Sequence, residues 1–296
     1  MNTETHYIEQ YLAPIYTQSS TYPLQIGDDC AVIDARDKIL TSVDSSVEEQ
    51  HFPKDLNPYY AAYRSVAVAI SDIYAMGGIP ESYLLSISHP QPSDIWFGEF
   101  SKGIEKVNQD YSLSLLGGDM VKGQLAITVT VFGKALGNIC ERANAKLGDN
   151  IFLSGPLGFG KAGLEDYQKG NKDEPSQYLM PQLISNHIIE KLNPIMNAAI
   201  DVSDGLVKDL GRICSASGMG AEILLSNIPH NNDPYDLVAG DDYVLCFTSS
   251  SPIENIIDID QNIHHIGKIV EGNEVLVVDL EGRQLDFNED GWESFK

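Results

Sequence analysis

The chain has 296 residues, 43% of them hydrophobic, enough to bury a sizeable core in one large or two ordinary domains. Asp and Glu outnumber Lys and Arg by 43 to 19, and a formal charge of −24 argues against binding to nucleic-acid phosphates. The four cysteines are well separated and show no C-x-x-C spacing, which favours reduced thiols. The sequence shows no export signal and no apolar run of about 18 residues, so we expect a cytoplasmic protein.

The first half of the chain alternates helix-like and strand-like stretches. A short amphipathic helix is expected over residues 4–16, and apolar runs predict short strands at 30–33 and 39–43. The apolar stretch 58–76, which Gly77-Gly78 ends, predicts a buried helix. The further expected elements are a strand at 83–88, a helix at 92–111, a strand at 113–116 and a strand at 124–132.

A change of composition at residues 137–149 indicates a domain boundary, which we place between residues 137 and 138. The second half also mixes strands and helices, so the expected fold is α/β, of the α+β type, with two mixed domains. The polar stretch 168–177 predicts an exposed loop. The other expected elements are a strand at 150–154, a helix after the following Gly-rich turn, helices at 179–192 and 205–217, a strand ending at residue 201, and strands at 221–225, 243–248, 263–270 and 274–280.

Asp72 is a carboxylate inside the otherwise apolar helix predicted at 58–76. A buried carboxylate is costly unless a cation or several donors neutralise it. Carboxylates also stand beside Gly or Ser at five further places, each next to an apolar run. Oxygen ligands drawn from the ends of several elements are what a site for several hard divalent cations requires. The five places are Gly27-Asp28-Asp29, Val43-Asp44-Ser45, Gly117-Gly118-Asp119, Asp201-Val202-Ser203-Asp204-Gly205 and Gly240-Asp241-Asp242.

Three of these segments allow more specific expectations. Asp119 is expected at the carboxyl end of the strand at 113–116, with a plain turn as the alternative. Asp201 and Ser203 share one face of an extended chain, and Asp204 is placed to cap the helix that follows, as a simple N-cap would. Asp44 is expected to open a polar loop over residues 45–52 that could close over a substrate.

The segment from Gly155 to Gly163 matches two nucleotide-binding patterns at once. It fits G-x-x-x-x-G-K, but Ala162 stands where a P-loop needs Ser or Thr to hold Mg²⁺. It also fits G-x-G-x-x-G, the dinucleotide-binding pattern, which requires an acid at the end of a second strand about 20 residues further on. That region is here the polar loop. We interpret the segment as a tight strand-to-helix turn, with a P-loop or dinucleotide-binding protein as the alternative.

Arg142, His51 and the pair His264-His265 each admit two interpretations. Arg142 is one of few arginines in an acidic chain, and either forms a salt bridge or contacts a phosphate. His51, next to Phe52, is either structural or faces a substrate. His264-His265 is expected at a strand edge without a functional role.

Taken together, these motifs resemble the thiamine-monophosphate kinases, a family of the aminoimidazole-ribonucleotide synthetase-like superfamily. The resemblance covers nearly the whole chain and rests on the order and spacing of its separate motifs. The similar segments are residues 26–31, 43–44, 51–52, 67–77, 117–119, 142–149, 199–206, 240–245 and 291–292.

The resemblance implies ATP-dependent phosphorylation of thiamine monophosphate with several Mg²⁺ ions. It also implies an N-terminal ATP- and metal-binding domain (residues 1–137) that dimerises through an intersubunit barrel, and a C-terminal α/β domain (residues 138–296). Since no nucleophile–base pair is evident, direct in-line transfer is favoured over a phosphoenzyme.

The resemblance assigns three sets of site residues by their position in the motifs. The implied Mg²⁺ ligands are Asp29, Ser42, Asp44, Asp72, Asp119, Asp201 and Asp204. The implied ATP contacts are Gly118, Asp119, Arg142 and Ser203. The implied contacts to thiamine monophosphate are His51, Asp241 and Trp292.

The chain departs from the family pattern at several of these motifs. Val43 and Asp241 stand where the family usually has Thr and Glu, and Met120-Val121-Lys122 replaces Thr-Thr-Arg. These departures affect substrate contacts more than the reaction. The alternatives are another ATP-using member of the superfamily, of the selenophosphate-synthetase or hydrogenase-maturation type, and a non-enzymatic module that binds divalent cations or nucleotides.

Overall fold

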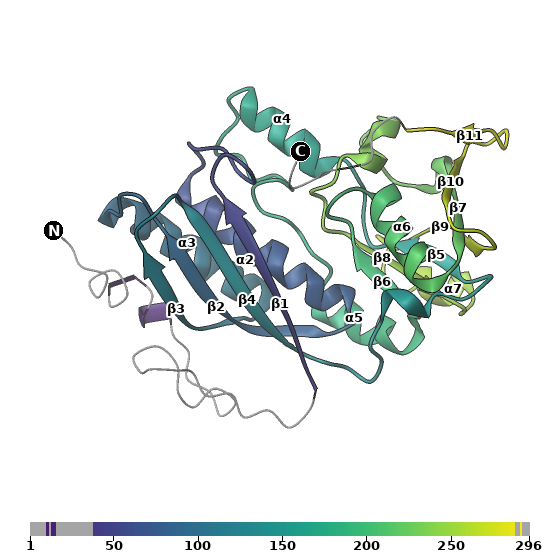
Figure 1. The fold of residues 1–296 in the computed structure, drawn as a ribbon, viewed down its shortest axis with the longest axis horizontal. Helices are drawn as coiled ribbons and strands as arrows, with labels where there is room; N and C mark the ends of the chain where they lie inside the picture. Colours follow the sequence, from purple (N-terminus) through teal and green to yellow (C-terminus); the bar gives the residue numbers. More distant parts are fainter. Residues whose placement is uncertain (1–9, 12, 16–37, 288–290, 292–296) are drawn as a thin grey trace. The chain divides into compact units, whose positions relative to one another are not determined.

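The fold is described from a computed structural model of the chain, which describes residues 10–11, 13–15, 38–287 and 291. The chain divides into two compact units, one of residues 1–73 and 79–135 and one of residues 74–78 and 136–296. Each unit combines one β-sheet with helices (Figure 1), which confirms the predicted mixed α/β organisation. The strand predicted at 30–33 and most of the helix predicted at 4–16 lie outside the described residues.

The first unit contains a four-stranded sheet with the strand order β1-β4-β2-β3. Strand β4 is antiparallel to β1 and β2, whereas β3 is parallel to β2 and follows it through helix α3. Helices α2 and α3 lie on the same face of the sheet (Figure 1). The elements are β1 (Ile39–Val47), α2 (Pro58–Ala75), β2 (Ile79–Ser88), α3 (Asp94–Tyr111), β3 (Ser114–Val121) and β4 (Ala126–Lys134).

The core of the first unit lies between the sheet and these two helices. Along β4, buried Ile127, Val129 and Val131 alternate with partly exposed Thr128 and Thr130, because successive side chains point to opposite faces of a strand. Helix α2 is buried nearly all round, as its sequence predicted.

Two strands are longer than the sequence predicted. β1 continues through Asp44 to Val47, because this whole stretch pairs with β4. β3 continues through Asp119 to Val121, because it pairs with β2. The expectations that Asp44 opens a loop and that Asp119 ends a strand are therefore wrong. Gly and Asp are disfavoured in strands, so only the pairing with neighbouring strands reveals these extensions.

The second unit contains a seven-stranded sheet with the order β11-β10-β7-β9-β5-β8-β6. Its core includes the buried face of α6, in particular Leu210 and Ile213, packed with strand residues such as Ile223 and Cys246. The strands are β5 (Asn150–Leu153), β6 (Ala199–Asp201), β7 (Gly220–Leu224), β8 (Leu245–Ser249), β9 (His264–Val270), β10 (Val275–Val278) and β11 (Gln284–Leu285). The helices are α4 (Phe159–Gln168), α5 (Asn186–Leu192), α6 (Leu206–Ser217) and α7 (Ile253–Ile257).

The helix predicted at 179–192 is shorter than expected. It begins only at Asn186, after Ser185, whose side chain accepts a hydrogen bond from the Ile188 N–H and caps the helix. His264 and His265 lie at the start of β9 and pair with β5, whereas the pairing of β9 with β7 covers only Gly267–Val270. The ring of His265 packs on Phe152, with 5.4 Å between ring centroids.

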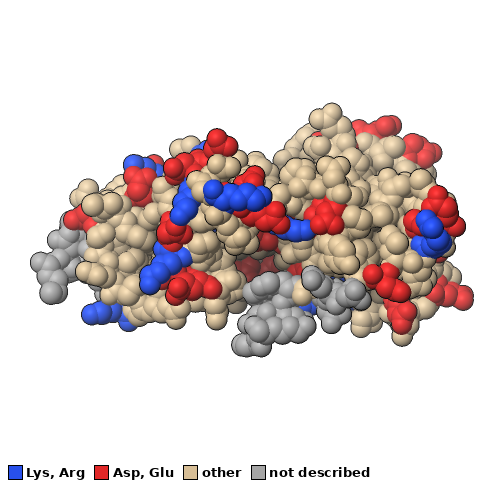
Figure 2. Space-filling view, turned by 90° about the horizontal axis from the view of Figure 1, so that it is seen from above, with Lys and Arg blue, Asp and Glu red and all other residues tan. Residues whose placement is uncertain are grey.

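The surface carries the acidic excess of the sequence. Figure 2 shows Asp and Glu side chains spread over the face that it draws, with Lys and Arg side chains next to many of them. Within the described part of the chain, no helix has both the length and the apolar character needed to cross a membrane.

Candidate functional site

Three of the predicted metal ligands meet in the first unit, on β1 and α2. Ser42 and Asp44 share one face of β1, because they are two residues apart on a strand. The Ser42 hydroxyl donates a hydrogen bond of 2.5 Å to Oδ2 of Asp72. Burial raises the pKa of the Asp44 carboxyl to about 6, and the nearby charge of Asp72 acts in the same direction. Two carboxylates this close are stabilised by a bound cation, which fits the predicted role.

Gly118 and Asp119 lie on the other edge strand, apart from this group. The strand register puts Gly118 level with Asp44, three strands away, roughly 14 Å at the usual strand spacing. Asp119 is the next residue, so its exposed side chain points to the opposite face of the sheet. At Gly118, a Cβ atom would lie 1.7 Å from the carbonyl oxygen of Leu85, so this position requires glycine.

His51 lies in the turn that follows β1. Its Nδ1 accepts a hydrogen bond of 3.0 Å from the backbone N–H of Val47, so the proton of the neutral ring is on Nε2. Phe52, the next residue, is buried. Nδ1 of His51 thus makes a structural hydrogen bond, and a contact with a substrate through Nε2 stays a prediction.

In the second unit, the loop that carries Ser203 and Asp204 is held by a buried acid that the sequence analysis missed. Asp209 is fully buried in α6, and its Oδ2 accepts hydrogen bonds from the N–H groups of Ser203 and Asp204, at 3.0 and 2.9 Å. Its Oδ1 accepts a bond of 2.5 Å from Arg212. Burial raises the pKa of Asp209 to about 6, although these donors act in the opposite direction. The sequence did contain a signal for Asp209, because it is an acid in the first turn of the helix predicted at 205–217, where carboxylates bind free N–H groups.

Asp204 does not cap α6, contrary to the expectation. The N-cap position is Gly205, and no side-chain capping bond is formed there. Asp209 accepts the N–H groups of Ser203 and Asp204, which precede the helix. The carboxylate of Asp204 instead pairs with Arg212 and, at 3.2 Å, with Lys208. Cationic side chains therefore neutralise this predicted metal ligand in the structure.

The second unit also brings Asp241 next to the loop that carries Ser203. The N–H of Asp241 donates to the carbonyl oxygen of Ser203 and that of Tyr243 to Val202, both at 2.8 Å. Gly240, Asp241 and Tyr243 have φ angles of 71°, 63° and 54°, in the left-handed region. Each non-glycine residue in that region costs about 1 kcal/mol, so contacts around the loop must maintain this conformation.

The Gly-rich turn at Gly155–Gly163 is filled by a side chain of the protein itself. The N–H groups of Gly158 and Gly160 donate to the two carboxylate oxygens of Asp242, at 2.7 and 2.9 Å. Burial raises the pKa of Asp242 to about 7, against the effect of these donors. N–H groups that would hold a phosphate in a P-loop hold a carboxylate here, which supports the interpretation as a structural turn.

Replacing Lys161 with alanine is expected to change kcat by less than about threefold, because its ammonium group pairs with Asp233 at 3.0 Å and Asp236 at 3.5 Å. A P-loop lysine would instead contact the β- and γ-phosphates, and its loss would abolish turnover. Steady-state kinetics of Lys161→Ala checks this expectation. A folded but inactive variant would place the nucleotide site at the Gly-rich turn.

Arg142 is exposed and forms no ion pair with another described residue. Its carbonyl oxygen accepts a hydrogen bond of 2.7 Å from the Ser217 hydroxyl at the end of α6. The backbone is therefore anchored while the guanidinium stays available for an anionic ligand, which favours the phosphate contact over the salt bridge.

The chain passes Asp204 again near its C-terminus. A Cβ atom on Gly291 would lie 2.4 Å from the carbonyl oxygen of Asp204, so these backbones are in close contact. Trp292, the next residue, lies outside the described residues, as does Asp29. Among residues that are described, no group of three or more His, Cys, Asp or Glu side chains is arranged to hold a metal ion.

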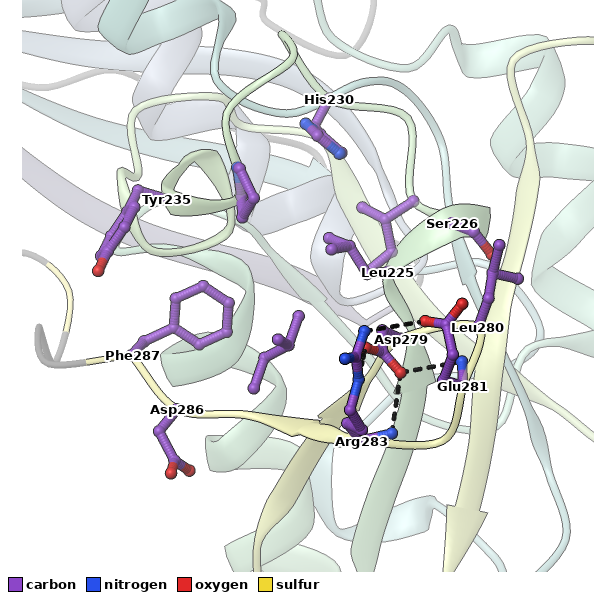
Figure 3. A pocket seen from close by; sticks show the side chains of 13 residues that line it. Leu225, Ser226, His230, Tyr235, Asp279, Leu280, Glu281, Arg283, Asp286 and Phe287 are labelled. Atoms are coloured by element: carbon purple, nitrogen blue, oxygen red, sulfur yellow. Dashed lines mark hydrogen bonds and ion pairs between the residues drawn. The ribbon is translucent and has the colours of Figure 1, made fainter.

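A cavity of about 650 Å³ lies elsewhere in the second unit, lined by residues between 225 and 235 and between 279 and 287 (Figure 3). The rings of Tyr235 and Phe287 meet edge to face on one side, and Arg283 is bound by Asp279 and Glu281 on the other. Of the predicted site residues that the structure describes, none lines this cavity.

Two family models match the chain. The family described as AIR synthase related protein, N-terminal domain, matches residues 27–135, and the corresponding C-terminal domain matches residues 146–279. The chain thus contains both domains of the AIR synthase-related proteins.

Sequence similarity to known relatives identifies a particular family within the AIR synthase-related proteins. Thiamine-monophosphate kinase of Escherichia coli K12 is 32% identical over 305 residues, which cover 96% of this chain and 93% of the relative. The enzyme of the same name from Buchnera aphidicola subsp. Schizaphis graminum is 40% identical over 76% of each chain. The chain belongs to the thiamine-monophosphate kinase family, and the resemblance inferred from its motifs is confirmed.

Solved structures agree with this assignment. The crystal structure of thiamine-monophosphate kinase from Stenotrophomonas maltophilia K279a superposes with a TM-score of 0.84, at 27% identity, and covers 96% of this chain and 99% of that one. A structure described as AaThiL complexed with AMPPCP and TMP superposes with a TM-score of 0.76, at 27% identity, covering 99% and 98%.

Proposed function

We propose that the protein transfers a phosphoryl group from ATP to thiamine monophosphate, forming thiamine diphosphate, and that it acts in the cytoplasm as a homodimer. The likeness to AaThiL complexed with AMPPCP and TMP carries this proposal, because it extends over 99% of the chain. The acidic motifs of both units agree with it, since phosphoryl transfer requires mainly alignment and neutralisation of charge.

Each unit carries residues for which we propose a role in binding. Mg²⁺ would neutralise the phosphate charges, and the oxygen atoms of Ser42, Asp44 and Asp72 fit such a cation because they converge around a partly desolvated carboxylate. The remaining proposed ligands are Asp29, Asp119, Asp201 and Asp204. The proposed ATP contacts are Gly118, Asp119, Arg142 and Ser203, and those to thiamine monophosphate are His51, Asp241 and Trp292.

The proposed homodimer rests on the face of the first sheet that α2 and α3 do not cover. This face carries Val43, which is 60% exposed, together with hydroxyl side chains such as Ser45 and Thr128. Among the described residues, β1 and β3 are the edge strands of this sheet, and pairing with a second copy into a barrel would remove these edges. Asp119 lies on the same face, so a second copy would bring other groups to it. Sedimentation velocity tests the stoichiometry.

A coupled assay of ADP release tests the proposed reaction. With ATP, Mg²⁺ and thiamine monophosphate we expect ADP release that matches the thiamine diphosphate formed, and that EDTA abolishes. The same assay with other phosphate acceptors, together with an assay of AMP release with selenide, tests the other reactions of the superfamily. ADP release with one of these acceptors, and none with thiamine monophosphate, would contradict the proposal.

Replacing Trp292 with alanine is expected to raise KM for thiamine monophosphate several-fold and leave KM for ATP nearly unchanged. The preceding residue, Gly291, lies against the backbone of Asp204, one of the proposed ligands. Contact between an aromatic ring and the cationic thiazolium contributes roughly 0.5–2 kcal/mol. Initial rates with each substrate varied in turn check this. An equal loss for both substrates, with a lower melting temperature, would show that Trp292 only packs.

A further inference from the structure

We propose that Asp242 is a positioning residue: bound by the N-terminus of α4, it fixes the Gly240–Tyr243 loop and thereby sets the place of Asp241 for thiamine monophosphate. This inference rests on the proposed function. It gives a role to the Gly-rich turn, which matches nucleotide-binding patterns without binding a nucleotide in our interpretation.

The contact between the turn and the loop is tight and entirely buried. Both carboxylate oxygens of Asp242 accept backbone N–H groups of the turn, and the side chain has no exposed surface. Asp242 is therefore bound on two atoms, which fixes both its position and its orientation. At Gly160, a Cβ atom would lie 2.2 Å from the carbonyl oxygen of Asp241, so the turn touches the backbone of the proposed substrate contact itself.

The loop is held from its other side as well. The Asp241 N–H binds the carbonyl of Ser203, and the side chain of Gln177 donates to the carbonyl oxygen of Asp242 at 2.7 Å. At Gly240, a Cβ atom would lie 2.5 Å from the Ser203 carbonyl oxygen. The loop is thus enclosed between the turn and the segment that carries Ser203.

We call the two hydrogen bonds between Asp242 and the Gly-rich turn the clamp. The conformation of the Gly240–Tyr243 loop explains why the clamp is needed. Asp241 and Tyr243 both have left-handed φ angles, which side chains with a Cβ atom rarely adopt. Without the bonds to Asp242, the loop would relax toward more common backbone conformations. Asp241 would move with it, and the acceptor substrate would lose its contact.

Two variants disturb the clamp from opposite sides. Asp242→Asn keeps the shape of the side chain but turns an NH₂ group toward a backbone N–H, so one of the two bonds is lost. Gly160→Ala removes no polar group and instead presses a methyl group against the Asp241 carbonyl. We expect each variant to raise KM for thiamine monophosphate about tenfold or more and to change KM for ATP less than threefold.

Gly267→Ala is the matched control. Its Cβ atom would lie 2.1 Å from the carbonyl oxygen of Glu222, a backbone clash as close as that of Gly160→Ala, but between β9 and β7 and without any residue that holds the loop. We expect the control to lose thermal stability but to keep the KM ratio of the two substrates. Direct calorimetric binding of thiamine monophosphate to each variant gives a second readout, independent of turnover.

The outcomes distinguish a failure of the clamp proposal from a failure of the proposed function on which it rests. If the unmodified protein turns over thiamine monophosphate and both clamp variants keep its KM ratio, the clamp is wrong and the function stands. The clamp is equally wrong if all three variants lose both substrates in proportion to stability. If the unmodified protein neither binds nor phosphorylates thiamine monophosphate, the proposed function is overturned, and the role of Asp242 with it.

Discussion

Replacing Asp72 with asparagine is expected to lower kcat at least about 100-fold, the scale for loss of a key electrostatic group, and to shift the melting temperature by only a few degrees. Asparagine has nearly the same shape as aspartate, and its carbonyl oxygen can still accept the hydrogen bond from Ser42. The variant also loses a charge that raises the pKa of Asp44, so repulsion in the folded state decreases. The variant therefore removes a negative charge from the proposed metal site, while the stability of the fold changes little.

The measurement is turnover at increasing Mg²⁺ concentration, together with thermal unfolding. Asp110→Asn is a matched control, because Asp110 is an acid of the same unit that accepts a hydrogen bond from Tyr63, at 2.9 Å, away from the proposed ligands. We expect this control to retain activity within about threefold, the effect of a peripheral hydrogen bond. A fully active Asp72→Asn variant would show that the acid in α2 does not bind the metal.

Replacing Asp209 with alanine is expected to cost about 100-fold in kcat/KM and to raise the Mg²⁺ concentration needed for half-maximal activity. The variant leaves the N–H groups of Ser203 and Asp204 without their acceptor, and Arg212 without one of its carboxylates. The loop that holds the proposed ligand Asp204 then loses its fixed position, and a misplacement of about 1 Å can cost about 100-fold in rate. Each buried donor left without a partner also costs about 1–3 kcal/mol of stability.

A second buried acid separates positioning from stability. Asp236 has 3% of its surface exposed, accepts the backbone N–H of Asp233 and pairs with Lys161, outside the proposed site. Asp236→Ala is expected to lower the melting temperature without changing the Mg²⁺ requirement. If Asp209→Ala behaves in the same way once the folded fraction is taken into account, Asp209 serves the fold and not the site.

The local sequence pattern was sufficient to predict those elements that are specified by their own residues. Helix α2 was predicted nearly to its ends, because an apolar stretch ended by two glycines specifies a buried helix without reference to other parts of the chain. The order of the acidic motifs was equally sufficient to indicate the family, since sequence spacing is preserved whatever the packing. The group formed by Ser42, Asp44 and Asp72 was foreseen as a set of residues, though not as a contact.

The class of fold, the family and most candidate residues followed from the sequence. Contacts between distant segments explain why β1 runs through Asp44 and why Asp204 pairs with Arg212 instead of capping α6. They also explain why Asp242 fills a turn that lies 84 residues earlier in the chain, at Gly158. These features depend on which donors and acceptors meet across the fold, and local periodicity and propensity contain no information about partners distant in sequence.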